Sequence, residues 1–277
     1  MTGINRVAAA GFASAADVYE RARPSYPGEA VAWLVAQTGL GPGKTVVDVG
    51  AGTGKLTRLL VAAGARVVAV EPIPEMRAKI RGVEVVDGTA EELPLADGAA
   101  DVVTVAQAFH WFDHGRALPE LHRVLKPGGS LALFWNMRDL DDELQRGVEE
   151  LLARYRSELP LGQTGAWREP LDRSPLFGEP TVADFRYQQL FTVDDLCDRV
   201  ASTSFVAAMA PVDREEVLVR VRALAHGVEE PFPFPYKTEV HLIPRVGDPP
   251  AIAASPSTQG WHRRVRSPRT RRVGGEG

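Results

Sequence analysis

The sequence predicts an α/β fold in which a mainly parallel sheet carries helices on both faces. Three observations support this. Short apolar runs rich in Val alternate with amphipathic segments of helical period over residues 28–135, which is typical of strand–helix–strand units. A glycine-rich turn joins the first strand to the next helix. With 44% hydrophobic residues in 277, the chain can also bury a sizeable core.

We assign the helices and strands from the spacing of their apolar residues. Pro24 and Pro27 restrict the backbone of residues 17–27, so we expect a non-helical connector of defined shape before the first helix. The helix ends at Gly39. We expect helices at 28–38, 55–63, 75–80, 115–125, 140–158, 193–203 and 213–225. We expect strands at 46–49, 66–70, 83–86, 101–106, 130–135, 181–189 and 236–243.

The glycine turn is the first candidate binding element. Gly50, Gly52 and Gly54 stand at alternate positions after a buried strand, so the backbone can turn sharply and a ligand can approach without a Cβ in the way. Glu71 ends the next strand about 20 residues further on, where a Rossmann-type fold places the acid that binds a ribose hydroxyl. The pattern therefore predicts a nucleoside site.

The spacing argues against two common nucleotide motifs. A dinucleotide fingerprint needs a third glycine at position 55, where the chain has Lys55. A Walker A loop needs glycine at 49 and a hydroxyl residue at 56, and the chain has Val49 and Leu56. A nicotinamide-dependent oxidoreductase is therefore the least favoured of the functions considered.

The pattern Asp48-x-Gly50-x-Gly52-x-Gly54 resembles motif I of the class I S-adenosylmethionine (SAM)-dependent methyltransferases, of the methyltransferase type 11-like group. The Leu-Lys-Pro-Gly-Gly turn at 125–129, before a hydrophobic strand, is a second resemblance. The resemblance runs from about Tyr19 to Pro244. It implies SAM as cofactor and a Rossmann-like seven-stranded, mainly parallel sheet with a C-terminal antiparallel strand pair and a helical lid.

The same resemblance indicates the residues that bind SAM. Tyr19 and Arg23, in the string Tyr-x-x-x-Arg-Pro-x-Tyr-Pro, would reach the methionine carboxylate, although a surface hinge explains the string equally well. Thr89-Ala90 replaces the acid-Ala or Ser-Ala pair at the adenine edge. The expected cofactor-binding residues are Tyr19, Arg23, Asp48, Gly50, Ala51, Gly52, Thr53, Gly54, Glu71, Pro72, Thr89, Ala90, Glu91 and Gln107.

The loop after strand 101–106 is expected to face the transferred methyl group, because ligands lie beyond the carboxyl ends of parallel strands. His110 in this loop is the candidate general base, and the alternative is that it forms part of an aromatic wall. A metal site at His110, Asp113 and His114 is improbable, because no second carboxylate or thiol group lies near them in the sequence. No metal is therefore expected.

These observations predict a SAM-dependent methyltransferase that acts on a small-molecule acceptor by in-line displacement. A non-catalytic protein that binds SAM or its demethylated product, S-adenosylhomocysteine (SAH), is the main alternative. The net charge of −4 argues against a nucleic-acid surface on the domain, and no apolar run approaches the ~20 residues that span a membrane. Cys197 is the only cysteine, so we expect a cytoplasmic protein without an intrachain disulfide.

We expect three regions along the chain. Residues 1–16 form a flexible terminus, 17–245 the methyltransferase domain, and 246–277 a basic disordered tail. Within the domain, about 40–136 form the cofactor half, and about 17–39 and 137–245 supply substrate and lid elements. Residues 160–180, rich in Pro and Gly, are expected to be a loop or lid.

Overall fold

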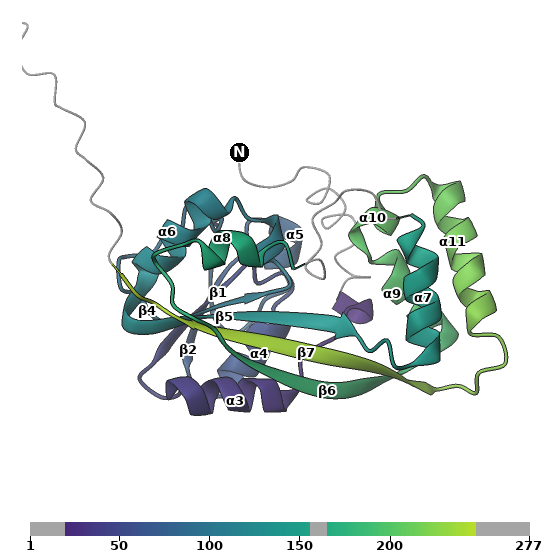
Figure 1. Cartoon of the computed structure of the whole chain (residues 1–277), viewed down its shortest axis with the longest axis horizontal. Helices are drawn as coiled ribbons and strands as arrows, with labels where there is room; N and C mark the ends of the chain where they lie inside the picture. The colour runs from purple at the N-terminus through teal and green to yellow at the C-terminus, as the bar shows by residue number, and fades with distance from the viewer. Residues whose placement is uncertain (1–19, 156–164, 248–277) are drawn as a thin grey trace, which may run out of the picture.

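The computed structural model describes residues 20–155 and 165–247. Seven strands form one sheet in the order β3-β2-β1-β4-β5-β7-β6 (Figure 1). Pairing is parallel from β3 to β5, and β7 then pairs antiparallel with both β5 and β6. The strands are β1 Thr45–Val49, β2 Arg66–Val70, β3 Glu84–Val86, β4 Ala100–Ala106, β5 Leu125–Arg138, β6 Thr181–Phe191 and β7 Phe232–Pro244. The predicted fold class is confirmed.

Helices cover both faces of the sheet, and the alternation of side chains along β1 shows how. Val46 packs in a cluster with Leu34 of α3 and Leu60 of α4, whereas the next residue, Val47, packs in a cluster with Leu121 of α6. The helices are α3 Gly28–Thr38, α4 Lys55–Ala62, α5 Pro74–Arg77, α6 His114–Val124, α7 Glu143–Ala153, α8 Arg168–Asp172, α9 Val193–Ala201, α10 Ser204–Ala207 and α11 Pro211–Leu224.

The Leu-Lys-Pro-Gly-Gly turn serves the sheet. Lys126 Nζ donates to Asp101 Oδ2 over 2.6 Å, and the Thr45 N–H donates to the same oxygen over 2.9 Å, so Asp101 joins β1, β4 and β5. A Cβ on Gly129 would lie 2.8 Å from the Asp101 carbonyl oxygen, which explains why the turn needs glycine there. The motif therefore fixes how β5 begins beside β4.

The antiparallel strands extend beyond the parallel part of the sheet, and a second group of helices packs there. Helices α7, α9, α10 and α11 lie together beyond the end of β5 (Figure 1). Their apolar residues form a separate cluster with Phe191 of β6 and with Phe234 and Tyr236 of β7. This helical layer, here defined as residues 143–153 and 193–224, corresponds to the predicted helical lid.

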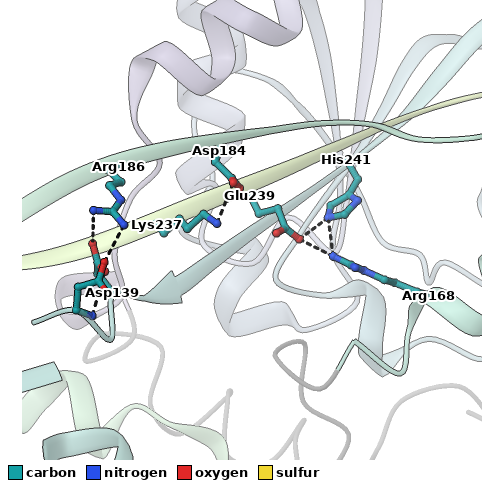
Figure 2. Close-up of polar contacts among 8 residues, drawn as sticks. Asp139, Arg168, Asp184, Arg186, Lys237, Glu239 and His241 are labelled. Atoms are coloured by element: carbon teal, nitrogen blue, oxygen red, sulfur yellow. Dashed lines mark hydrogen bonds and ion pairs between the residues drawn. The ribbon is translucent and has the colours of Figure 1, made fainter. Parts of the chain in front are cut away.

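Charged pairs hold the antiparallel strands and α8 together, as Figure 2 shows. Lys237 of β7 pairs with Asp184 of β6 at 2.8 Å. Glu239 of β7 accepts from Arg168 of α8 over 2.8 Å and contacts the buried ring of His241 at 2.5 Å. The contact with Arg168 fastens α8 to the sheet.

Two sequence expectations need correction. The described part of 160–180 contains α8, and Trp167, Leu171, Leu176 and Phe177 are buried in the core rather than forming a loop or lid. These apolar residues are separated by Pro, Gly and charged residues, so they show neither helical nor strand period. The folded domain also runs past 245, because the Val246 N–H donates to the Leu176 carbonyl over 2.9 Å.

Several sequence expectations lie outside the described residues. These are the terminus 1–16, the contact of Tyr19 and the basic tail from 248 onward. Within the part of the chain that the structure describes, no helix is both long and apolar enough to cross a membrane.

Candidate cofactor site

The glycine turn after β1 adopts a backbone that favours glycine at all three positions. Gly50, Gly52 and Gly54 have φ of 67°, 58° and 83°. A Cβ on Gly50 would lie 2.8 Å from the Ala108 Cβ, and one on Gly54 would lie 3.2 Å from Ile80 Cγ1. Only Gly52 opens onto free space, with its nearest neighbour 4.0 Å away. Close packing thus requires glycine at Gly50 and Gly54, whereas the space beside Gly52 is open; the cofactor contacts of Gly50 and Gly54 stay predictions.

Glu71 at the end of β2 holds this turn. Its Oε2 accepts from the Gly52 N–H over 2.7 Å, and its Oε1 accepts from the Ile73 N–H over 2.9 Å. Burial raises the pKa of the Glu71 carboxyl, and the two backbone hydrogen bonds oppose that rise. A carboxylate offers about four lone-pair positions, so each oxygen can still accept a hydroxyl group.

Asp48 lies beneath the turn and is 1% exposed. Its Oδ2 accepts from the Thr57 hydroxyl over 2.6 Å and its Oδ1 from the Thr104 hydroxyl over 2.8 Å. Burial raises the pKa of Asp48 to about 6 despite these hydrogen bonds. Asp48 therefore joins β1 to α4 and β4, and it supports the turn from below.

A pocket opens where the glycine turn meets the end of β5 and α9. It brings together six of the predicted site residues: Arg23, Gly50, Ala51, Gly52, Thr53 and Gln107. It is also lined by Pro24, Tyr26, Lys55, Leu56, Ala106, Asn136 and Arg199. Pro24 and Tyr26 belong to the string that suggested an N-terminal cover over the cofactor.

Gln107 stands out in the pocket wall, because it has φ of 57° and is the one non-glycine residue with positive φ in the described chain. Such backbone strain often occurs at functional sites. Its side chain donates to the Asn136 carbonyl over 3.0 Å, and the Asn136 amide donates to the Ser25 carbonyl over 2.8 Å. These bonds join the ends of β4 and β5 to the segment before α3.

Two arginines approach the pocket from different elements. Arg23 donates from Nη2 to the Ser202 carbonyl at the end of α9 over 2.8 Å. Arg199, on α9 itself, donates from Nε to the Tyr236 hydroxyl over 3.3 Å. Sequence reasoning missed Arg199, Asn136 and Lys55 as pocket residues. Arg199 and Asn136 belong to no sequence motif, and Lys55 is marked only by its position directly after Gly54.

The other predicted residues do not line this pocket. Ala90 and Glu91 are buried, and Glu91 Oε1 accepts from the Asp113 N–H over 2.9 Å. Thr89 and Pro72 are half-buried. Glu91 thus anchors the loop before α6, while the contacts expected for Thr89, Ala90 and Pro72 stay predictions.

His110 lies in an aromatic group with Trp111 and Trp135, at ring-centroid distances of 4.7 and 5.5 Å. Burial, and after it the charge of Arg23, lowers the pKa of His110 to about 3. His110 is therefore uncharged at neutral pH. Its buried Nδ1 has no hydrogen-bond partner among the described residues. Across the described ranges 20–155 and 165–247, no group of three or more His, Cys, Asp or Glu could hold a metal ion.

A Rossmann-like sheet of this order, with a glycine turn after β1 and an acid at the end of β2, defines the class I methyltransferase fold. The comparisons agree. Residues 47–133 match the family model described as a methyltransferase domain. A protein of Mycobacterium tuberculosis described as an uncharacterized methyltransferase is 43% identical over 81% of this chain and 89% of its own length.

A Schizosaccharomyces pombe protein described as uncharacterized methyltransferase-like is 34% identical over 75% of this chain and 82% of its own. Among solved structures, a chain described as a type II methyltransferase from Anaeromyxobacter dehalogenans superposes with a TM-score of 0.61 at 24% identity. That match covers 79% of this chain and 97% of the other. The chain therefore belongs to the class I SAM-dependent methyltransferases, and SAM is its cofactor.

Proposed function

We propose that this protein transfers a methyl group from SAM to a small-molecule acceptor by in-line displacement in the pocket between the glycine turn and α9. The observation that carries the proposal is the lining of the pocket. Gly52, its neighbours and Asn136 come from the cofactor half, whereas Arg199 comes from the helical layer. Donor and acceptor could therefore meet in one enclosure.

The residues present fit the cofactor. The free space over Gly52, which a Cβ would fill, leaves the turn open to a ligand. Glu71 is already oriented by two backbone hydrogen bonds and would accept a ribose hydroxyl on a free lone pair. Arg23 would bind the methionine carboxylate, and Thr89 with Ala90 would contact the adenine edge. We further propose contacts from Ala51, Thr53, Pro72 and Gln107.

When bound, SAM supplies an activated methyl group with a good leaving group, so the protein has to align the acceptor atom with it. Positioning of this kind is worth roughly 7–11 kcal/mol, whereas a general base adds a factor of about 10²–10⁴. A dedicated base is therefore not required. His110 remains the candidate, although a base with a pKa of about 3 accepts a proton only weakly near neutral pH.

Two measurements test the proposal. Calorimetry with SAH should show binding that is lost in Glu71→Ala and Gly52→Val; unchanged affinity in both variants would contradict the assigned site. Turnover of labelled SAM in the presence of a fractionated metabolite pool would then separate an enzyme from a protein that only binds SAM or SAH. Cofactor binding without turnover in any fraction would favour the non-catalytic alternative.

A further inference from the structure

Arg199 of α9 is a buried cation with unused hydrogen-bonding capacity. The residue is 8% exposed and lines the pocket. Its Nε donates to the Tyr236 hydroxyl over 3.3 Å, and its buried Nη1 has no hydrogen-bond partner among the described residues. A guanidinium keeps its charge at all ordinary pH values, and leaving part of it buried and unsatisfied is costly. A ligand that accepts from Nη1 would remove that cost.

The surroundings of Arg199 carry an excess of positive charge. Arg23, Lys55 and Arg199 line the pocket, and none of the lining residues that the structure describes is Asp or Glu. Glu20, outside the lining, lies 3.9 Å from Lys55 Nζ and partly balances the charge of that residue. Burial, followed by the charge of Arg199, lowers the pKa of the nearby Arg138 to about 10. Glu149 forms an ion pair with Arg138, at 3.1 Å from its Nε. The pocket therefore suits an anion.

The cofactor does not supply enough negative charge to balance this pocket. SAM carries one carboxylate against an ammonium and a sulfonium group, so its net charge is positive. Under the proposed function, Arg23 takes that carboxylate. Arg199 lies on α9, beyond residue 133 where the family match ends, and it packs against Tyr236 of β7. Because Arg23 is assigned to the single carboxylate of the cofactor, Arg199 is left for the acceptor.

We propose that Arg199 binds a carboxylate of the methyl acceptor, and that the substrates of this enzyme are small organic acids. This inference rests on the proposed function. The planar guanidinium matches the two oxygens of a carboxylate, and such charge-assisted bonds give both affinity and orientation. A cationic acceptor would meet repulsion from three cations in the lining and no acid among its described residues. Arg199 acts here as a specificity-determining residue.

The test compares acids with neutral molecules of the same shape. With wild-type protein saturated in SAH, calorimetry is run with succinate against succinamide and with benzoate against benzamide. We expect an acid to bind more tightly than its amide, and Arg199→Gln to weaken acid binding about 10–100-fold while SAH affinity is unchanged. Arg220→Gln is the matched control, because Arg220 is an exposed arginine of the same helical layer, paired with Glu216.

Two further measurements make the result decisive. Arg199→Lys keeps the charge but loses the paired donors, so it should bind the acid with intermediate affinity, and it carries the test if Arg199→Gln does not fold. Transfer from labelled SAM should occur with the acidic fraction of a metabolite extract and be lost in Arg199→Gln.

The failures can be told apart. If the wild type binds SAH but prefers no acid to its amide, and transfers methyl only to neutral or basic fractions, the inference is wrong and the proposed function stands. If Arg199→Gln loses SAH affinity instead, Arg199 holds the cofactor and the inference is again wrong. If the wild type does not bind SAH, the proposed function fails first and the inference fails with it.

Discussion

The Glu71 carboxylate accepts a hydrogen bond from the Gly52 N–H over 2.7 Å, and this bond links the end of β2 to the turn after β1. The acid proposed to bind the ribose therefore also sets the shape of the turn on which the cofactor would rest. Because the second oxygen of Glu71 is held by the Ile73 N–H, the side chain is positioned before any ligand arrives. Pre-organisation of this kind reduces the entropy that binding costs.

Replacement of Glu71 by Gln tests this double role. Gln keeps the size of Glu, but its amide nitrogen would face one of the two backbone N–H donors. We expect SAH affinity to fall by about tenfold or more, since a hydrogen bond to a charged group is worth about 1.5–3 kcal/mol. Calorimetry measures this, and Glu75→Gln in α5, at an exposed position, is the control. Equal affinity in Glu71→Gln and wild type would remove Glu71 from the site.

Gly52→Ala separates backbone strain from loss of ligand space. Gly52 and Gly43 both have positive φ, and neither has an atom close enough to clash with a new Cβ. Each change to Ala should cost about 1–2 kcal/mol of stability through its left-handed backbone. Only Gly52→Ala should also weaken SAH binding, because Gly52 lines the pocket and Gly43 does not. A similar loss of affinity in both variants would show that strain alone is responsible.

The raised pKa of Asp48 predicts a pH dependence of stability. A carboxyl whose folded pKa, about 6, exceeds the ordinary value of 3.8 is favoured in its protonated form by folding. Its contribution is complete below about pH 4 and is lost as pH rises to about 6, a change of about 3 kcal/mol. In urea unfolding between pH 4.5 and 6.5, Asp48→Asn should lack this decline. Parallel curves for the variant and the wild type would contradict the assignment.

Asp101 should behave in the opposite way. Partial burial acts to raise its pKa, but hydrogen bonds from Lys126, the Thr45 N–H and Lys44 lower it to about 2. The stabilisation is therefore present above about pH 4 and disappears as pH falls toward 2. Asp101→Asn should lower the free energy of unfolding at pH 7 and have little effect at pH 2.5. An equal loss at both pH values would indicate a packing effect rather than titration.

His110 should leave no trace in the pH–rate profile between pH 5 and 8, because its pKa is about 3. We expect His110→Phe to keep that flat profile and to change the Michaelis constant for the acceptor more than the turnover number. Labelled-SAM kinetics over this pH range gives both quantities. A wild-type limb near pH 6.5 that vanishes in His110→Phe would instead establish His110 as a base that titrates near neutral pH.

Much of the fold could be predicted from the sequence. In the cofactor half, the apolar residues of each strand and helix recur at the spacing typical of that element, and Gly or Pro marks its ends. Helix α8 was not predicted. Its buried apolar residue Leu171, and Trp167 just before it, pack against residues that are distant in the sequence, so no local pattern marks them. The motif implied that Asp48 touches the cofactor, but strand alternation puts it on the same face as Val46, under α4. This orientation could have been predicted from the sequence, because side chains alternate between the two faces along a strand.

The residues of the pocket that were missed have a common cause. Arg199 lies on an amphipathic helix among other charged residues, and nothing in its spacing distinguishes it from an exposed arginine. Its burial depends on Tyr236, which follows it by 37 residues and belongs to a different element. Such a pairing is a property of tertiary packing, so a single sequence does not reveal it.

The pairing of β5 with β7 runs without a shift from Ser130↔Pro244 to Arg138↔Tyr236. One end of this ladder adjoins the parallel strands, and the other sets where Tyr236, and through it Arg199, stands. Under the proposed function, the register of this ladder would therefore set the distance between the glycine turn and Arg199. A slip of a single residue would turn Tyr236 to the opposite side of the sheet, together with the buried Phe234 and Val240 of the same strand, so the register is held by the core as well as by the ladder.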